Sequence, residues 1–386
     1  MEASGKAPLP LEGIRVIELA RILAGPWAGQ LLADLGAEVL KIERPGEGDD
    51  TRQWGPPFIE AADGTNLGAA YFHACNRGKQ SLAIDIATAE GQEAVRRLVA
   101  ESDIVIENFK VGGLARYGLD AKALRTHNPR LIYCSITGFG QTGPYAERAG
   151  YDFMIQGLSG IMDLTGDPKG EPQKVGVAFA DIFTGLYATV AILAALQRRH
   201  ATGEGGHIDM ALLDCQVSVL ANQAMNYLVS GRSPSRLGNA HPNISPYQTF
   251  PSSDGYLIIA VGNDGQFSRL CDELGLSALA GDPRFSSNAA RVANRDVLSA
   301  LIGERTILRQ RDELLSLFAD LNVPAGPINT VADAFADPQV VARALHIEIE
   351  TPHGPIPGVS SPIVIDGERM VSSAASPELP ASESEP

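Results

Sequence analysis

Asp181 is the residue whose surroundings most favour covalent chemistry. It stands alone in an apolar stretch, GVAFADIFTG, with Gly176 before it and Gly185 after it. An apolar environment disfavours the charged form of a carboxylate, and this makes the group more basic and more nucleophilic. The same pattern is typical of a helix N-cap, because Asp is a preferred capping residue and Thr184 follows three positions later. The pattern by itself leaves both interpretations open.

No pattern in the sequence indicates a metal site or a nicotinamide cofactor. The seven histidines show neither HxH nor HExxH spacing. The turn after the first expected strand contains Pro26, which removes a backbone donor from the place where a dinucleotide pyrophosphate would bind. The cysteines form no CxxC pair and are widely spaced, at Cys75, Cys134, Cys215 and Cys271. We therefore expect no metal site and no permanently bound cofactor.

The elements that must position Asp181 belong to a parallel α/β arrangement. Short β-rich runs alternate with helical patterns through the first third of the chain, as in βαβ units. The expected helices lie around Gly29–Leu35 and Glu90–Ala100. The expected strands are Arg15–Leu19, Glu38–Glu43, Ser81–Ile84, Ile104–Glu107, Leu131–Ile136 and His207–Met210.

The run from Gly176 to Leu196 has a single charge and is long enough to span a membrane. Spanning would leave Asp181 unpaired inside the bilayer. A buried helix entered through an acidic residue explains the pattern, and we expect that helix.

The length of 386 residues predicts two domains rather than one core. From about Tyr227 the sequence becomes rich in Ser, Arg, Gly, Pro and Asn, which marks a boundary. We predict a large Rossmann-like domain at 10–226, a small α+β domain at 227–329, and a return to the large domain at 330–371. Residues 372–386 consist largely of Ser, Ala, Pro and Glu, and this composition predicts a disordered tail.

Charge and cysteine content limit the partners. With 31 basic and 46 acidic residues the net charge is −15, which disfavours binding to nucleic acid and to anionic membrane surfaces. The cysteine spacing fits a reducing compartment, and residues 1–10 show no secretory signal. We expect a cytoplasmic protein.

A series of motifs, taken together, closely resembles family III CoA-transferases, the CaiB/BaiF or formyl-CoA transferase-like type. The motifs follow in order from Pro10 to about Phe267, and VPAGPIN and DPQV extend the likeness over nearly the whole chain. The motifs are PLEGIRVIELARILAGP, DLGAEVLKIERPGEGDDTR, VIENFKVGGLARYGL, YCSITGFGQTGP, RAGYD, GVAFADIFTG, TGEGGHIDMALLD and AVGNDGQF.

The resemblance implies that Asp181 is the nucleophile. In the family an Asp at the head of a D-x-x-T-G segment attacks an acyl-CoA thioester, forming an acyl-aspartyl anhydride and releasing CoA thiolate. A glycine-rich loop excludes water in these enzymes, and Gly262, Gly265 and Gln266 occupy that position here. This loop has two glycines, whereas the formyl-CoA transferases carry a run of them; an ordinary strand-to-helix turn is the alternative interpretation.

The resemblance also implies a set of residues that bind coenzyme A. Arg and Lys side chains suit its phosphates and Phe109 suits the adenine. A formyl-CoA transferase carries Gln where this chain has Leu23, so formate and oxalate are not the expected acids. The implied residues are Ile22, Leu23, Arg44, Asn76, Lys79, Asn108, Phe109 and Arg116.

Two related functions remain as alternatives. Racemases on the same scaffold carry a histidine base where this chain has Tyr151, and a tyrosine hydroxyl is a poor base at neutral pH. The other alternative is an acyl-CoA-binding protein without catalysis, against which the intact Asp181 argues.

Several motifs resemble the subgroup that moves coenzyme A between short dicarboxylic acids. The implied donor is succinyl-CoA, and Arg52 and Arg148 are candidates to hold the second carboxylate of a dicarboxylic acid. The family also implies an interlocked homodimer.

Overall fold

A computed structural model describes residues 8–61 and 63–380, which form two compact units. Unit 1 comprises residues 8–161, 175–220 and 338–380 within that range, and unit 2 comprises residues 162–174 and 221–337. Unit 2 is therefore larger than the predicted small domain at 227–329, because it also includes residues 162–174 and extends further at both ends.

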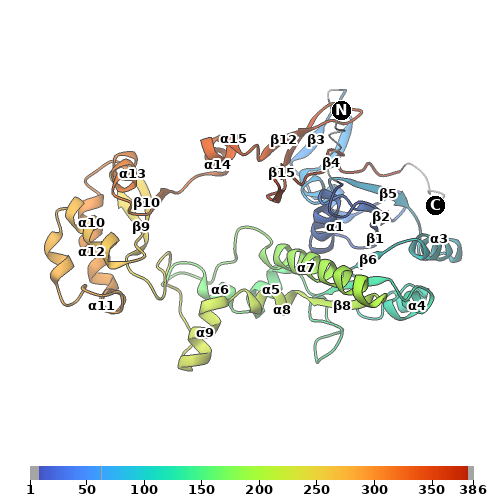
Figure 1. Cartoon of the computed structure of the whole chain (residues 1–386), viewed down its shortest axis with the longest axis horizontal. Helices are drawn as coiled ribbons and strands as arrows, with labels where there is room; N and C mark the ends of the chain where they lie inside the picture. The colour runs from blue at the N-terminus through green and yellow to red at the C-terminus, as the bar shows by residue number, and fades with distance from the viewer. Residues whose placement is uncertain (1–7, 62, 381–386) are drawn as a thin grey trace. The chain divides into compact units, whose positions relative to one another are not determined.

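Unit 1 is built on a six-stranded parallel sheet in the order β5-β2-β1-β6-β7-β8 (Figure 1). The order reverses between β1 and β6, and in open parallel sheets ligands bind beyond the carboxyl ends of the strands at such a point. The strands are β1 (Arg15–Glu18), β2 (Glu38–Glu43), β5 (Lys79–Ala83), β6 (Ile104–Glu107), β7 (Ile132–Thr137) and β8 (Gly206–Ala211).

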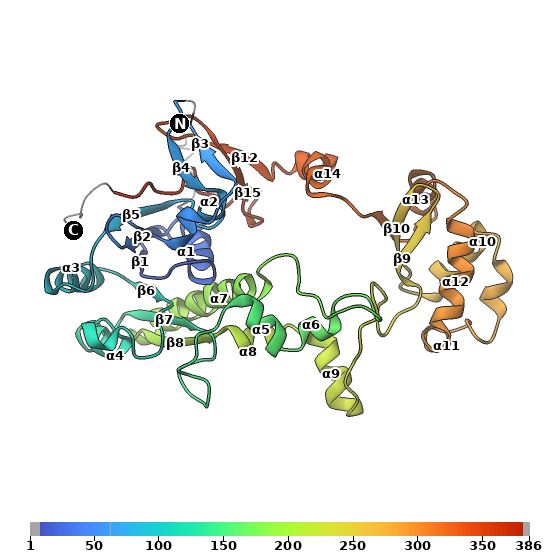
Figure 2. The same ribbon diagram turned by 180° about the vertical axis from the view of Figure 1, so that it is seen from behind.

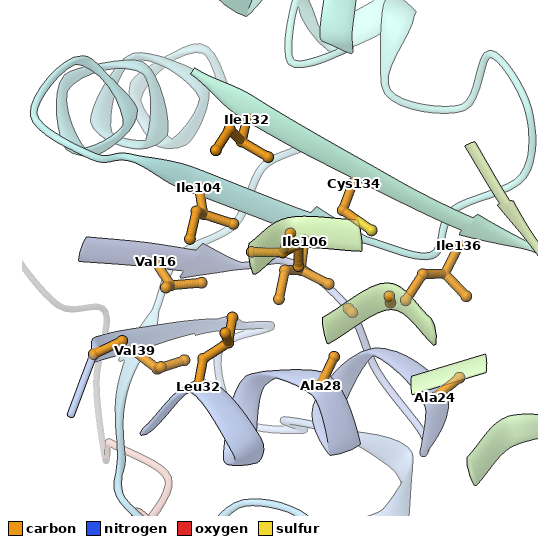
Figure 3. Close-up of a cluster of buried hydrophobic side chains, with 14 of the residues drawn as sticks. Val16, Ala24, Ala28, Leu32, Val39, Ile104, Ile106, Ile132, Cys134 and Ile136 are labelled. Carbon is orange, nitrogen blue, oxygen red and sulfur yellow. The ribbon is translucent and has the colours of Figure 1, made fainter. Parts of the chain in front are cut away.

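Helices cover both faces of this sheet, and side chains alternate between two cores. Val16 and Ile104 belong to the core beneath α1 (Ala24–Asp34) and α7 (Phe179–Thr202), whereas Ile17 belongs to the core beneath α3 (Ala89–Ala100) and α4 (Ala121–His127). Figure 3 shows side chains of α1 directed at those of the strands. This two-sided coverage buries every residue of β6 and β7, and the layers match the predicted Rossmann-like architecture.

One helix of the described part, Phe179–Thr202, is long and apolar enough by length and composition to cross a membrane. Its buried residues include Ala180, Thr184, Ala188 and Ile192. That spacing is a helical stripe, packed here on α1 and the sheet. Core packing therefore accounts for the apolar run.

The remaining elements of unit 1 are short. They include two-stranded pairings of β3 with β4, β12 with β13 and β14 with β15. Their bounds are β3 (Phe58–Glu60), β4 (Asn66–Ala69), α2 (Ala70–His73), α5 (Asp152–Leu158), α8 (Leu212–Ser218), α15 (Pro338–Ala342), β12 (His346–Ile349), β13 (Ile356–Val359), β14 (Val364–Ile365) and β15 (Glu368–Arg369), with 3-10 turns at Asp50–Gln53 and Ala115–Tyr117.

Residues 372–380 differ from the disordered tail predicted for 372–386. The Ser372 N–H donates to Asp34 Oδ1 at 2.9 Å, and the carbonyl of Ala374 accepts from the Gly78 N–H at 3.0 Å. The segment is held by its backbone groups, which composition does not reveal. Residues 381–386 of the predicted tail lie outside the described residues.

Unit 2 contains a three-stranded antiparallel sheet, in the order β11-β10-β9, packed on helices (Figure 2). The bounds are β9 (Tyr247–Ser252), β10 (Gly255–Ala260), α10 (Asp264–Glu273), α11 (Asn288–Ala293), α12 (Arg295–Thr306), α13 (Arg311–Asp320), β11 (Ala325–Pro327), α9 (Ala221–Ser230) and α14 (Val331–Ala336), with a 3-10 turn at Ser277–Gly281 and the short α6 (Ile161–Leu164) at the unit boundary.

Candidate active site

Asp181 lies in the first turn of α7 and lines a cavity of about 390 Å³ within unit 1. We call this space the Asp181 cavity. It opens beyond the carboxyl ends of β1, β6 and β7, where the strand order predicts a ligand site. Its lining includes Arg21, Ile22, Leu23, Ala24, Asp50, Trp54, Asn108, Phe109, Lys110, Arg148, Tyr151 and Asp152.

The first turn of α7 is capped by a side chain from another helix. Ala178, the N-cap residue, makes no side-chain capping bond, and Asp152 of α5 supplies the acceptor instead. Asp152 Oδ1 accepts from the backbone N–H groups of Ala180 at 2.8 Å and Asp181 at 3.4 Å. Gln156, one turn later on α5, donates to Asp152 Oδ2 at 2.8 Å and accepts from the Val175 N–H at 2.9 Å. The alternative interpretation required Asp181 to cap this helix, but the N-cap residue is Ala178 and the capping side chain is that of Asp152.

The Asp181 carboxylate has a strongly raised pKa. Burial, together with the negative charge of Asp152, raises its pKa to about 7. Within residues 8–61 and 63–380, no hydrogen bond or ion pair engages this carboxylate. A basic and unpartnered carboxylate that lines a cavity is suited to nucleophilic attack or to proton transfer.

Two glycines bring the segment before α5 to the end of β7. A Cβ added to Gly138 would come within 2.6 Å of the Gly150 Cα, so the two backbones touch only because both residues are glycine. This contact places Tyr151 and Asp152 at the cavity. The Tyr151 side chain is 63% exposed, and this residue also lines the cavity.

Four of the residues predicted to bind coenzyme A come together at the Asp181 cavity. Ile22 and Leu23 stand between β1 and α1, and Asn108 and Phe109 follow β6. The Asn108 side chain is occupied by the backbone of Arg21, with Oδ1 accepting from its N–H and Nδ2 donating to its carbonyl.

Two further predicted residues line a neighbouring cavity of about 390 Å³, which we call the Arg44 cavity. Arg44 and Arg116 both line it, and both side chains are exposed. Arg21 and Phe109 line both this cavity and the Asp181 cavity, so the two spaces adjoin. Two guanidinium groups beside an aromatic ring suit an anionic nucleotide.

Asn76 and Lys79 are placed differently from the prediction. Both are buried, and Lys79 Nζ lies 2.9 Å from Glu18 and 2.8 Å from Asn76 Oδ1. Neither side chain is open to a ligand phosphate in this structure, and their contact with coenzyme A stays a prediction. The ion pair with Glu18, which lies 61 positions earlier in the sequence, offsets the cost of burying the Lys79 charge.

The two arginines predicted to hold a substrate carboxylate lie in different environments. Arg52 is half-buried, makes a bidentate ion pair with Glu43, with contacts of 2.9 and 2.6 Å, and stacks on Phe72. Its guanidinium is already bonded to Glu43 and to the Pro377 carbonyl, and Arg52 does not line the Asp181 cavity, which favours Arg148 of the two candidates. Arg148 is exposed, lies over the ring of Tyr145 and lines the Asp181 cavity.

The predicted glycine loop lies in unit 2, between β10 and α10. Asn263 Oδ1 accepts from the Gln266 N–H at 2.9 Å, and Gln266 Oε1 accepts from the Gly262 N–H at 2.7 Å. Gly265 lies in the first turn of α10. Locally this is the capped strand-to-helix turn of the alternative interpretation.

Sequence reasoning did not assign Asp152, Trp54 or Lys110 to the site, although all three line the Asp181 cavity. Asp152 had a signal, since it ends the RAGYD motif. Lys110 had a similar signal, since it follows Phe109 in the VIENFKVGGLARYGL motif, whereas Trp54 lies outside the quoted motifs. No group of three or more His, Cys, Asp or Glu side chains in the described part of the chain is arranged to hold a metal ion.

Comparisons with known proteins agree on one family. The model of CoA-transferase family III matches residues 11–382. A succinate–glutarate CoA-transferase of Agrobacterium fabrum is 60% identical over 371 residues, covering 96% of this chain and 93% of that protein. A human succinyl-CoA:glutarate CoA-transferase is 42% identical, covering 96% of this chain and 83% of that protein. The crystal structure of a CaiB/BaiF family protein from Brucella suis is 63% identical, with a TM-score of 0.85 over 96% of this chain and 97% of that one.

Proposed function

Since the chain belongs to CoA-transferase family III and is an acyl-CoA:carboxylate CoA-transferase, we propose that succinyl-CoA is its donor and that glutarate or a similar short dicarboxylic acid is its acceptor. The predicted family, fold class and enzyme class are confirmed by the relatives above. The proposed acids are those named for relatives that are 60% and 42% identical to this chain.

We propose that Asp181 is the covalent nucleophile. Its carboxylate oxygen attacks the thioester carbonyl, the carbon–sulfur bond breaks, and the electron pair leaves with CoA thiolate to give a mixed anhydride. The thiolate then attacks the aspartyl carbonyl, which frees the donor acid and leaves an aspartyl-CoA thioester. The acceptor carboxylate repeats these steps in reverse, so Asp181 returns unchanged and no ATP is needed. The observation that carries this proposal is the unpartnered carboxylate in the cavity, with its pKa raised to about 7.

The adjoining cavities suggest how an acyl-CoA lies. We propose that the thioester occupies the Asp181 cavity and that the nucleotide lies in the Arg44 cavity, where Arg44 and Arg116 supply positive charge. Phe109 lines both spaces and is the proposed apolar contact between them.

Arg148 is the proposed contact for the second carboxylate of a dicarboxylic acid. It lines the Asp181 cavity, and no carboxylate of the described residues is paired with it. A guanidinium at this place discriminates against monocarboxylic acids, because their apolar end would leave its charge unmatched.

Steady-state rates test the proposed substrates. With succinyl-CoA as donor, glutarate should give a higher kcat/KM than oxalate, formate or a bulky monocarboxylic acid such as carnitine. A monocarboxylic acid or oxalate with a higher kcat/KM than glutarate and the other dicarboxylic acids of four to six carbons would overturn the substrate assignment and leave the family unaffected.

We further propose that the active protein is a cytoplasmic homodimer. Large apolar side chains of unit 1 are exposed on α5 and α7, including Phe153 at 59%, Leu158 at 55% and Val190 at 62%, and such patches mark protein interfaces. All four cysteines are free and buried, which suits a reducing compartment. Sedimentation should give twice the chain mass of 40.8 kDa, and Val190→Glu should shift it toward the monomer. A monomeric and fully active wild-type protein would exclude the dimer.

A further inference from the structure

The turn between β1 and α1 has a strained backbone at the wall of the Asp181 cavity. Ile22 lies at φ 72, in the left-handed region that a β-branched residue rarely adopts. Ile22 and its neighbour Leu23 both line the cavity. Such a conformation persists only where the surrounding structure imposes it.

Side chains from three other segments hold every backbone polar group of Arg21 and Ile22. Asn108 bonds both the N–H and the carbonyl of Arg21, at 2.9 and 2.7 Å. The Ile22 N–H donates to the carboxylate of Asp49, with both oxygens at 3.3 Å. The Sγ of Cys75 lies 3.6 Å from the Ile22 carbonyl oxygen, as a weak donor.

Asp49 is itself fixed by a buried charge network. Its side chain is inaccessible to solvent, and Lys41 Nζ lies 2.9 Å from Oδ2. The N–H and hydroxyl of Thr51 donate to Oδ1 at 3.0 and 2.8 Å. Lys41 also contacts Glu18 at 3.0 Å, and these two residues are register partners on β2 and β1.

The net contribution of this charge network to the stability of the fold is small. Burying charges removes their hydration, so an ion pair such as Lys41 with Asp49 contributes little net stability compared with apolar residues of the same size. The network also holds the Asp49 carboxylate in place, where it accepts from the N–H of the strained Ile22 as well as from Thr51.

The conformation of this turn sets the position of the first turn of α1 relative to α7, the helix that carries Asp181. Helix α1 starts at Ala24, directly after the turn. A Cβ added to Gly185 of α7 would lie 2.7 Å from the Ala24 carbonyl oxygen, so the two helices touch at this point. Gly185 is one helical turn after Asp181. A shift of the turn would therefore move the start of α1 against the segment that carries the nucleophile.

We propose that Asp49 is a positioning residue for CoA transfer, which holds Ile22 in its left-handed conformation and so fixes the wall of the Asp181 cavity. The inference rests on the proposed role of that cavity and does not depend on which acids are exchanged.

The first measurement uses the free wild-type protein and no substrate. Hydrogen exchange, followed by mass spectrometry on overlapping peptides, should show the Ile22 amide protected about tenfold or more relative to an unstructured chain. An Ile22 amide that exchanges at the unprotected rate would overturn the proposal. This result is independent of catalysis, so it remains valid if the proposed function fails.

The second measurement is a double-mutant cycle on kcat/KM with succinyl-CoA. Asp49→Asn keeps an acceptor but removes the charge that pairs with Lys41, and we expect a loss of about tenfold or more. Ile22→Gly removes the strain, because glycine adopts a positive φ without cost. The glycine should therefore recover activity in the Asp49→Asn background, relative to its own effect in the wild type. If Asp49→Asn does not fold, Thr51→Val, which removes one donor to Asp49, should show a smaller loss with the same recovery.

Asp34→Asn is the matched control. Asp34 is also a buried aspartate in an ion pair, with Arg77 at 2.6 Å, but it bonds Arg77 and the Ser372 N–H rather than Ile22. Its substitution should lower the melting temperature without any recovery by Ile22→Gly. Equal recovery in the Asp34→Asn and Asp49→Asn backgrounds, or strictly additive effects of Asp49→Asn and Ile22→Gly, would contradict a positioning role.

Discussion

The carboxylate of Asp152 accepts a hydrogen bond from the backbone N–H of Asp181, with Oδ1 and N 3.4 Å apart. One acidic residue therefore caps the helix whose first turn carries the other. The cap stabilises the helix end, while its negative charge disfavours ionisation of Asp181. The same side chain, Asp152, therefore both positions the proposed nucleophile and contributes to its raised pKa.

Replacing Asp152 should move the pH dependence of the reaction. Asp152→Asn keeps an acceptor for the Ala180 N–H but removes the charge, so the pKa of Asp181 should fall while burial keeps it above the ordinary value. The acidic limb of kcat/KM, which we expect near pH 7 in the wild type, should move to lower pH. Asp152→Ala should in addition destabilise the protein by about 1–2 kcal/mol through loss of the cap. An acidic limb that stays in place in Asp152→Asn would show that this charge does not act on the titrating group.

The ionisation of Asp181 should cost stability. Its folded-state pKa, about 7, exceeds that of the unfolded chain, so its contribution is fully present below the unfolded pKa and is lost as pH rises through 7. Asp181→Asn cannot ionise and should be more stable than the wild type above pH 7, by roughly 4 kcal/mol for a pKa raised to about 7. The difference should shrink as pH falls toward 4. Urea unfolding at several pH values measures it, and a difference that is constant with pH would contradict the raised pKa.

The two arginines first considered for substrate should respond differently to the same change. Arg148→Gln should raise the KM for a dicarboxylic acceptor by about tenfold or more and leave that for a monocarboxylic acid nearly unchanged. Arg52→Gln should destabilise the fold by roughly 3–5 kcal/mol, because Glu43 would remain buried without its partner. Kinetics and thermal unfolding on both variants separate the roles. A selective effect on KM from Arg52→Gln would reverse the assignment.

The protein should not epimerise substrates. The sequence resemblance to racemases predicts that Tyr151 replaces their histidine base, and a tyrosine hydroxyl is a poor base at neutral pH. Incubation with a 2-methylacyl-CoA in heavy water should leave the α-hydrogen unexchanged by mass spectrometry. Rapid incorporation of deuterium that is lost in Tyr151→Phe would place the protein among the racemases.

Much of the α/β frame could be predicted from the sequence. Strands Glu38–Glu43 and Ile104–Glu107 have the predicted bounds because each is a short run rich in Val and Ile between helical patterns. Helix α1 begins at Ala24, earlier than the predicted Gly29, since Pro26 is tolerated in the first turn, where its missing N–H is not needed.

The roles of single charged residues could not be predicted in the same way. Arg44 and Arg52 are close in sequence, yet Arg44 is exposed at a cavity and Arg52 is half-buried in an ion pair with Glu43. Lys79 is buried because Glu18 lies beside it across the sheet. Such pairings depend on tertiary contacts between distant positions, and local sequence does not encode them in a readable form.

Covalent trapping of Asp181 tests the central claim most directly. The wild-type protein is incubated with succinyl-CoA and hydroxylamine, which converts an activated aspartyl group to a hydroxamate, and its peptides are then mapped by mass spectrometry. We predict one hydroxamate, on the peptide that contains Asp181, and none in Asp181→Ala, which should still fold and bind CoA but transfer none. Full activity of Asp181→Ala, or a hydroxamate on another carboxylate, would contradict the account.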